Sequence, residues 1–319
     1  MKDPFRDWRV SVKKSIIILL ALAFIFTFVA CNPQVPEDDS AINKEITYKY
    51  WQWDSSKSEW VQLTDTVTDY TVVTSSTTEW KNKFYVVTSD VEIQDRVQVS
   101  WDTKLIICDG AELKVPKGID ISEYESLTVF TNDSGTGKLT IDNCDSGYPG
   151  IGSKGNAGSV FIYDCIINVT GGYKSAAIGC GDAEGCNSGV FEIFGGTVTA
   201  TGGSQGAGIG GGFKNDAEEI TIHRGTVIAT GTDGGAGIGG GNEGRGGDVV
   251  LDGGTVIATG SANSSEYIGM GIGQGAVALA SGMISGQKLA HLKVSDDNDN
   301  WGYYLGESKQ YMKVVEGEL

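Results

Sequence analysis

The chain has few of the residues on which acid–base or nucleophilic catalysis relies. Only two histidines, His223 and His291, occur in 319 residues, so no Ser/His/Asp set can be nominated. The sequence also lacks a pair of Cys-x-x-Cys motifs, which argues against structural zinc. Basic residues are scarce, since 24 Lys and Arg stand against 41 Asp and Glu and the net charge is −17. Because phosphate groups are bound by basic surfaces, nucleic acid is not an expected partner.

What the chain has instead is a glycine-rich repeat between residues 150 and 286, a stretch that holds 39 of the 47 glycines. Apolar residues alternate with variable ones in the runs between the glycines, which is the period of a strand with one buried face. The residue before each Thr-Val pair or its equivalent recurs at intervals of 31, 29, 29 and 28 residues, at Cys165, Gly196, Gly225, Gly254 and Gly282. A fixed period near 29 residues indicates a solenoid.

Short strands of this kind cannot bury their apolar faces alone. Stacked coils can, because each backbone group then pairs with the coil above or below while the inward side chains fill the centre. We therefore predict an all-β chain with a right-handed parallel β-helix over residues 91–286, regular from about residue 150. The aromatic-rich segment 46–90 is expected to contain a hairpin and to cap the N-terminal end, and residues 287–319 to cap the C-terminal end.

The segments Gly206–Gly211 and Gly235–Gly240 match the pattern G-x-G-x-x-G of dinucleotide sites. That pattern binds a nucleotide where it opens a helix after a strand. Here it recurs with the period of the coil and no helical pattern follows it, so no nucleotide is expected to bind.

The first thirty residues have the organisation of an export signal, with five basic residues followed by an uncharged apolar run from Ser15 to Ala30. The run ends in Phe-Val-Ala-Cys31, which resembles the lipobox of bacterial lipoproteins, although Phe28 stands where leucine is usual. The resemblance implies cleavage before Cys31, lipidation of Cys31 with diacylglycerol and an acyl chain such as palmitate, and a membrane-anchored protein of the bacterial cell envelope, outside the cytoplasm. A plain secretory signal or a single membrane anchor is the alternative. Residues 31–45 are expected to be a disordered tether.

Five cysteines remain once Cys31 is lipidated. Cys180 and Cys186 bracket a turn and are the pair expected to form a disulfide in an oxidising compartment. Cys108, Cys144 and Cys165 lie in or beside apolar runs, where cysteine is usually a small core residue.

The units Gly195–Gly203 (GGTVTATGG) and Gly206–Gly212 (GAGIGGG) resemble a family of glycine-rich bacterial surface proteins with a right-handed parallel β-helix. Some members of that broad group are adhesin-like or carbohydrate-binding, and the fold is shared with pectate lyases and polygalacturonases. The resemblance implies a lipid-anchored, non-catalytic binding or adhesion protein for polysaccharide or host glycan. The ordered signatures of polygalacturonases are missing, so we do not expect an enzyme. A surface spacer without a ligand is the alternative, and a pectate-lyase-like enzyme a more remote one.

Two surfaces are candidate ligand sites. In the first, outward side chains of successive coils, about 4.8 Å apart, would form a flat grid suited to a polysaccharide or, more remotely, to ice. Its members are Thr197, Thr199, Thr201, Thr226, Thr230, Thr255 and Thr259, with Ile228 and Ile257 between them. The alternative is that threonine is there because β-branched residues suit exposed strands. The second surface consists of Trp51, Trp53 and Trp60, whose rings could stack on sugars or pack on the solenoid.

A calcium site is also considered near the C-terminus. Four oxygen-bearing residues stand at positions 1, 3, 5 and 12 of an EF-hand-like spacing, namely Asp296, Asn298, Asn300 and Glu307. Trp301 occupies position 6, where such a loop needs glycine for its sharp turn. The alternative is an ordinary Asp/Asn-rich turn, and no other cofactor is expected.

Overall fold

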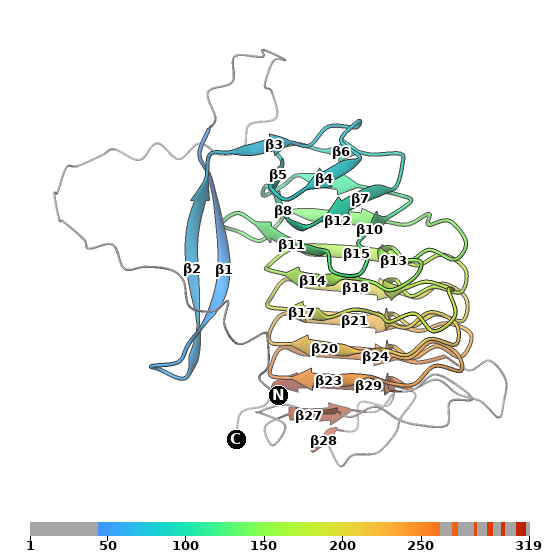
Figure 1. Ribbon diagram of the computed structural model, residues 1–319. Coiled ribbons are helices and arrows are strands. Elements are labelled where there is room, and N and C mark those ends of the chain that lie inside the picture. Colours follow the sequence, from blue (N-terminus) through green and yellow to red (C-terminus); the bar gives the residue numbers. More distant parts are fainter. Residues whose placement is uncertain are drawn as a thin grey trace, which may run out of the picture.

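The computed structural model describes residues 44–261 and 270–273, and beyond them the backbone of residues 284–285, 292–295, 301–303 and 311–316. The fold is a right-handed parallel β-helix in which each coil contributes one strand to each of three sheets (Figure 1). In the part of the chain described, every regular element is a strand, and none is a helix long and apolar enough to cross a membrane.

The three sheets are named by a feature of each: a glycine in most strands of the first, a ladder of stacked rings beside the second, and outward threonines on the third. The glycine sheet contains β4 (Glu79–Lys81), β7 (Val97–Ser100), β10 (Ile119–Asp120), β13 (Ile151–Ser153), β16 (Ile178–Cys180), β19 (Ile209–Gly210), β22 (Ile238–Gly239) and β25 (Ile272–Gly273). The ladder sheet contains β3 (Tyr70–Val72), β5 (Phe84–Val87), β8 (Asp102–Ile107), β11 (Ser126–Thr131), β14 (Ser159–Ile162), β17 (Phe191–Ile193), β20 (Glu219–Ile222), β23 (Asp248–Leu251) and β26 (Ile284–Ser285). The threonine sheet contains β6 (Val91–Glu92), β9 (Glu112–Lys114), β12 (Lys138–Ile141), β15 (Ile166–Thr170), β18 (Thr197–Thr201), β21 (Thr226–Thr230) and β24 (Thr255–Thr259).

The inward rows of side chains confirm the predicted stacking. Ile193, Ile222 and Leu251 are register partners on successive coils, and each is at most 1% exposed. Val198 and Val227 form an equivalent row in the threonine sheet. Complete burial of one such side chain contributes about 1.5–3 kcal/mol, so the filled bore is the main source of stability.

The β-helix begins earlier than predicted, at about Tyr70 rather than residue 91. Strand β3 pairs in parallel with β5, and β4 pairs in parallel with β7. Trp80 of β4 is fully buried and its ring stacks on Tyr85 at 5.5 Å between centroids. Large aromatic side chains fill the bore in this first coil, where the glycine-rich pattern of the later coils is absent.

The predicted hairpin is present, but it does not cap the end of the solenoid. Strands β1 (Ile46–Asp54) and β2 (Glu59–Val67) pair antiparallel over their whole length. The hairpin lies along the side of the stack, next to the ladder sheet (Figure 1). Its aromatic rings pack against outward side chains of the coils. These contacts hold the hairpin beside the stack, so it does not cover the bore.

At the C-terminal end, the threonine sheet changes from parallel to antiparallel pairing. Strand β29 (Tyr311–Glu316) lies antiparallel to β24, followed by β27 (Leu292–Ser295) and β28 (Trp301–Tyr303). These strands occupy the edge that a further coil would otherwise extend.

Glycine is required at one position of the glycine sheet in every regular coil. Gly210 has φ +129°, and a Cβ placed there would approach the carbonyl oxygen of Gly239 on the next coil to 2.1 Å. Gly179 and Gly239 have the same conformation and the same close contact. An L-residue has neither the backbone freedom nor the space at these sites.

We therefore expect Gly210→Ala to lower the free energy of unfolding by about 2 kcal/mol or more, because it combines a strained φ with a steric clash. Urea unfolding followed by circular dichroism measures this. Gly155→Ala is the matched control, since a Cβ at Gly155 meets no atom within 4 Å and the change should stay within about 0.5 kcal/mol. Equal loss in the two variants would contradict the steric requirement.

Candidate ligand-binding surface

The outer face of the threonine sheet carries the predicted grid in register. Thr197, Thr226 and Thr255 are direct partners on β18, β21 and β24. Two further rows run parallel to it: Thr199, Ile228 and Ile257 in the middle, and Thr201, Thr230 and Thr259 at the far side. All nine side chains are partly exposed. The surface therefore combines hydroxyl groups, which donate and accept hydrogen bonds, with methyl groups at a regular spacing.

Towards the N-terminal coils the same face becomes charged. The Glu112 carboxylate accepts a hydrogen bond from the Thr140 hydroxyl at 2.7 Å and pairs with the Lys138 ammonium at 2.9 Å. The Thr140 hydrogen bond, and after it the bond from Lys138, lowers the pKa of Glu112. This network lies on β9 and β12, and β15 separates it from the threonine field, which extends over β18, β21 and β24.

Two of the three candidate tryptophans pack on the solenoid. The Trp60 ring lies 5.3 Å from that of Phe194 and 4.6 Å from that of His223. The Trp51 indole N–H donates to Asp164 at 3.2 Å, and the Arg224 guanidinium lies 4.3 Å from the Trp51 ring centroid.

Trp53 is the third of these rings. It is 39% exposed and meets Trp60 edge to face at 5.6 Å. Trp51 and Trp60 therefore hold the hairpin in place, and of the three only Trp53 offers much free ring surface.

The hairpin covers a ladder of stacked rings that the repeat analysis did not identify. Phe130, Tyr163, Phe194 and His223 each follow one residue of the inward register row formed by Val129, Ile162, Ile193 and Ile222. Consecutive ring centroids are 5.1, 4.4 and 4.7 Å apart. These distances are close to the spacing of stacked coils, about 4.8 Å. Tyr48 of the hairpin packs on Phe130 at 4.7 Å, and its burial, followed by the charge of Asp65, raises the pKa of Tyr48 to about 12.

His223 ends this ladder between two carboxylates. Its Nδ1 lies 3.1 Å from Asp252 and its Nε2 lies 3.4 Å from Glu192, while its side chain is 9% exposed. The repeat pattern predicts that His223 occupies a variable, outward-facing position. In the fold it faces away from the bore, but Trp60 covers it, so His223 has a packing role in docking the hairpin.

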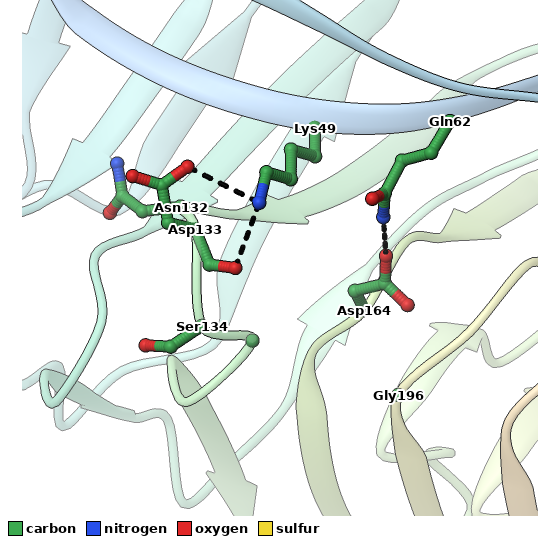
Figure 2. A pocket seen from close by; sticks show the side chains of 8 residues that line it. Lys49, Gln62, Asn132, Asp133, Ser134, Asp164 and Gly196 are labelled. Carbon is green, nitrogen blue, oxygen red and sulfur yellow. Dashed lines mark hydrogen bonds and ion pairs between the residues drawn. The ribbon is translucent and has the colours of Figure 1, made fainter.

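A polar hollow of about 290 Å³ remains between the hairpin and the coils (Figure 2). The Lys49 ammonium donates to the backbone oxygen of Asp133 at 3.1 Å and pairs with its carboxylate at 3.3 Å. Gln62 donates to Asp164 at 3.0 Å. The remaining lining residues are Asn132, Ser134, Gly135 and Gly196. The charged and amide groups of the hollow thus pair across the hairpin interface and strengthen the docking.

The expected Cys180–Cys186 disulfide is not formed in the structure, where both residues are free and buried. The Cys180 thiol donates to the carbonyl of Cys186, and the Cys186 thiol donates to the carbonyl of Gly181, each at 3.6 Å. The hydrogen bond with Cys180, and then burial, raises the pKa of the Cys186 thiol.

Asn215 of the next coil holds this turn instead of a disulfide. Its amide donates to the carbonyl oxygens of Gly181 and Ala183 at 3.0 and 2.9 Å, and its oxygen accepts from the Cys186 N–H at 3.1 Å. No sequence pattern points to this contact, except that a single asparagine follows a glycine turn. Of the remaining cysteines, Cys108 and Cys165 are buried as expected, and burial raises the pKa of Cys165 to about 12.

Two predicted sites lie outside the described residues. They are the lipidation site, Cys31, and the calcium candidates, Asp296, Asn298, Asn300 and Glu307. Within residues 44–261 and 270–273, no group of three or more His, Cys, Asp or Glu side chains is arranged to hold a metal ion.

Comparison with known proteins agrees with the fold. A family model described as a beta helix repeat matches residues 191–213 and 220–242, which are the two most regular coils. No curated protein and no solved structure matches the chain.

We expect Trp60→Ala to loosen the hairpin without unfolding the solenoid, because Trp60 joins the hairpin to Phe194 and His223. Amide hydrogen exchange in β1 and β2 should accelerate by about tenfold or more, which corresponds to about 1.4 kcal/mol, while β17 and β20 keep their protection. Trp101→Ala is the control, since the Trp101 side chain is 72% exposed on a different corner. Unchanged exchange in β1 and β2 would show that the ladder contacts do not hold the hairpin.

Proposed function

We propose that the chain is a non-catalytic, lipid-anchored surface protein of the glycine-rich bacterial repeat family and that it binds polysaccharide or host glycan. The observation that carries the proposal is the threonine grid on β18, β21 and β24, whose rows are in register on three consecutive coils. A flat surface that repeats at the coil spacing suits a partner that is itself flat and repetitive, which describes an extended sugar polymer better than a folded protein.

The chemistry of the grid supports the same partner. Sugar rings present hydroxyl groups and C–H groups together, and the grid offers hydroxyls on Thr197, Thr226 and Thr255 beside methyls on Ile228 and Ile257. The chain has 24 Lys and Arg against 41 Asp and Glu, so the extended basic surface that nucleic acid requires is not expected.

The position of the hairpin fits an anchor at the N-terminus. Strand β1 begins at Ile46, about fifteen residues after Cys31, and the hairpin lies beside the ladder sheet. A tether of that length allows the solenoid to stand away from the membrane, with the outer face of the threonine sheet unobstructed by the hairpin. The resemblance of residues 28–31 to a lipobox supports lipidation of Cys31.

The combined variant Thr197→Lys, Thr226→Lys and Thr255→Lys is expected to abolish polysaccharide binding while the melting temperature moves by only a few degrees. Three long charged chains would cover the flat grid, whereas the inward core is unchanged. A glycan array followed by calorimetry on neutral and acidic polysaccharides provides the measurement.

The triple Thr→Val variant at the same positions is the matched control, because it keeps the shape and removes the hydroxyls. Reduced binding by this variant would assign the affinity to the hydroxyl groups. If the triple lysine variant still binds, the binding site does not lie on the threonine sheet. If the unmodified protein binds no polymer, a spacer without a ligand is favoured.

Replacement of Cys31 tests the anchor separately. Cys31→Ala should release the protein from the membrane fraction and remove the mass of the lipid, because a thiol at this position is the only acceptor for the diacylglycerol group. Globomycin, which blocks the lipoprotein signal peptidase, should leave the precursor uncleaved. An unchanged mature mass and an unchanged membrane partition in Cys31→Ala would exclude lipidation.

A further inference from the structure

One corner of the solenoid gathers aromatic and cationic side chains that the repeat does not require. Tyr173 and Lys174 lie in the loop from β15 to β16, and Phe213 and Lys214 lie in the loop from β19 to β20. The two loops meet, since the Phe213 N–H donates to the carbonyl of Lys174 at 2.9 Å. Two aromatic–lysine dipeptides from different coils thus come together on the surface.

The next coil has the same backbone with different side chains. There Gln205 takes the place of Lys174, with φ +68° against +64°, and the Asn242 N–H donates to the Gln205 carbonyl at 2.9 Å. Glu243 takes the place of Lys214, with φ +66° against +63°. The fold therefore accepts uncharged polar or acidic side chains at these positions, so packing and backbone geometry do not explain the aromatic–lysine pairs.

The side chains of the corner form one arrangement around the Lys174 ammonium. This group lies 4.7 Å from the Phe213 ring centroid and 5.5 Å from the Tyr173 ring centroid, and Tyr173 is 53% exposed. Cation–π contacts of this kind contribute about 0.5–1 kcal/mol at exposed sites, which is enough to orient the amine between the rings.

The neighbouring charges leave Lys174 available. Lys214 pairs with Glu243 at 3.5 Å, and Lys154 on the preceding coil pairs with Asp182 at 3.6 Å. Lys174 has no carboxylate partner among the described residues. In a chain with a net charge of −17, an unpaired ammonium held between two rings is a specific feature of this corner.

We propose that this corner binds a sugar unit that carries a carboxylate, so that the polymer recognised by the protein is an acidic polysaccharide. Lys174 pairs with the sugar carboxylate in a charge-assisted hydrogen bond, and the exposed ring of Tyr173 contacts the C–H face of the sugar. Phe213 is partly exposed, with the Lys214 ammonium 5.1 Å from its ring centroid, and it supports the position of Lys174. The inference rests on the proposed function and places a specificity site beside the grid, because Tyr173 follows the last residue of β15, Thr170, by three positions.

The test compares acidic polymers with neutral forms of the same chains. Hyaluronate and alginate, and the methyl ester of each, are titrated into the full chain by calorimetry. We expect the acids to bind at least about tenfold more tightly than the esters, since a hydrogen bond to a charged group contributes about 1.5–3 kcal/mol. Lys174→Gln should lose that advantage, and Phe213→Ala should weaken binding to both forms.

Matched controls use the equivalent positions of the next coil. Gln205→Ala and Glu243→Gln should leave the preference for acids unchanged, and circular dichroism should confirm that Lys174→Gln keeps the fold. Equal affinity for acid and ester, an unaffected Lys174→Gln variant, or equally tight binding of polyglutamate would overturn the inference. If polysaccharide binding without a preference for acids still depended on the threonine grid, the proposed function would stand. If the protein bound no acidic or neutral polysaccharide, both the proposed function and this inference would be overturned.

Discussion

The close approach of successive coils is the constraint on which the rest of the structure depends. Parallel strands pair only if every coil brings its backbone to about 4.8 Å from that of the next coil, and at the glycine sheet this requires residues without a Cβ. Gly179, Gly210 and Gly239 meet both conditions, a positive φ and direct contact with the next coil. Because each regular coil is fixed at this position of the glycine sheet, the inward rows align and the outward rows align with them.

Much of the fold could be predicted because the same pattern of apolar and variable residues recurs in every regular coil. The alternation that places Ile193, Ile222 and Leu251 inward recurs with the coil period, and the rows of Thr197, Thr226 and Thr255 follow from the same register. A signal that is repeated several times outweighs local ambiguity about any one strand.

The features that could not be predicted depend on contacts between residues that do not share the repeat. The aromatic segment predicts a cap over the open end because a terminal coil must cover its core and its unpaired edges. The partners of the hairpin are instead the outward positions Phe130, Phe194 and His223, which look merely variable in the sequence. Likewise, the turn between Cys180 and Cys186 is held by Asn215 from the following coil rather than by a bond between the two thiols. The start of the solenoid was missed because Trp80 fills the first coil in place of the glycine pattern.

The docked hairpin also changes how the solenoid should come apart. Coils of a solenoid touch only their neighbours, so such folds tend to fray from an end and their unfolding loses cooperativity as they lengthen. Here one element contacts several coils at once, from Phe84 and Phe130 through Asp164 to His223. The hairpin therefore couples coils that do not meet one another, and loss of order in one of these coils weakens the attachment of the others. The covered part of the solenoid should consequently unfold as a single cooperative unit, whereas the coils beyond His223 depend on their neighbours alone.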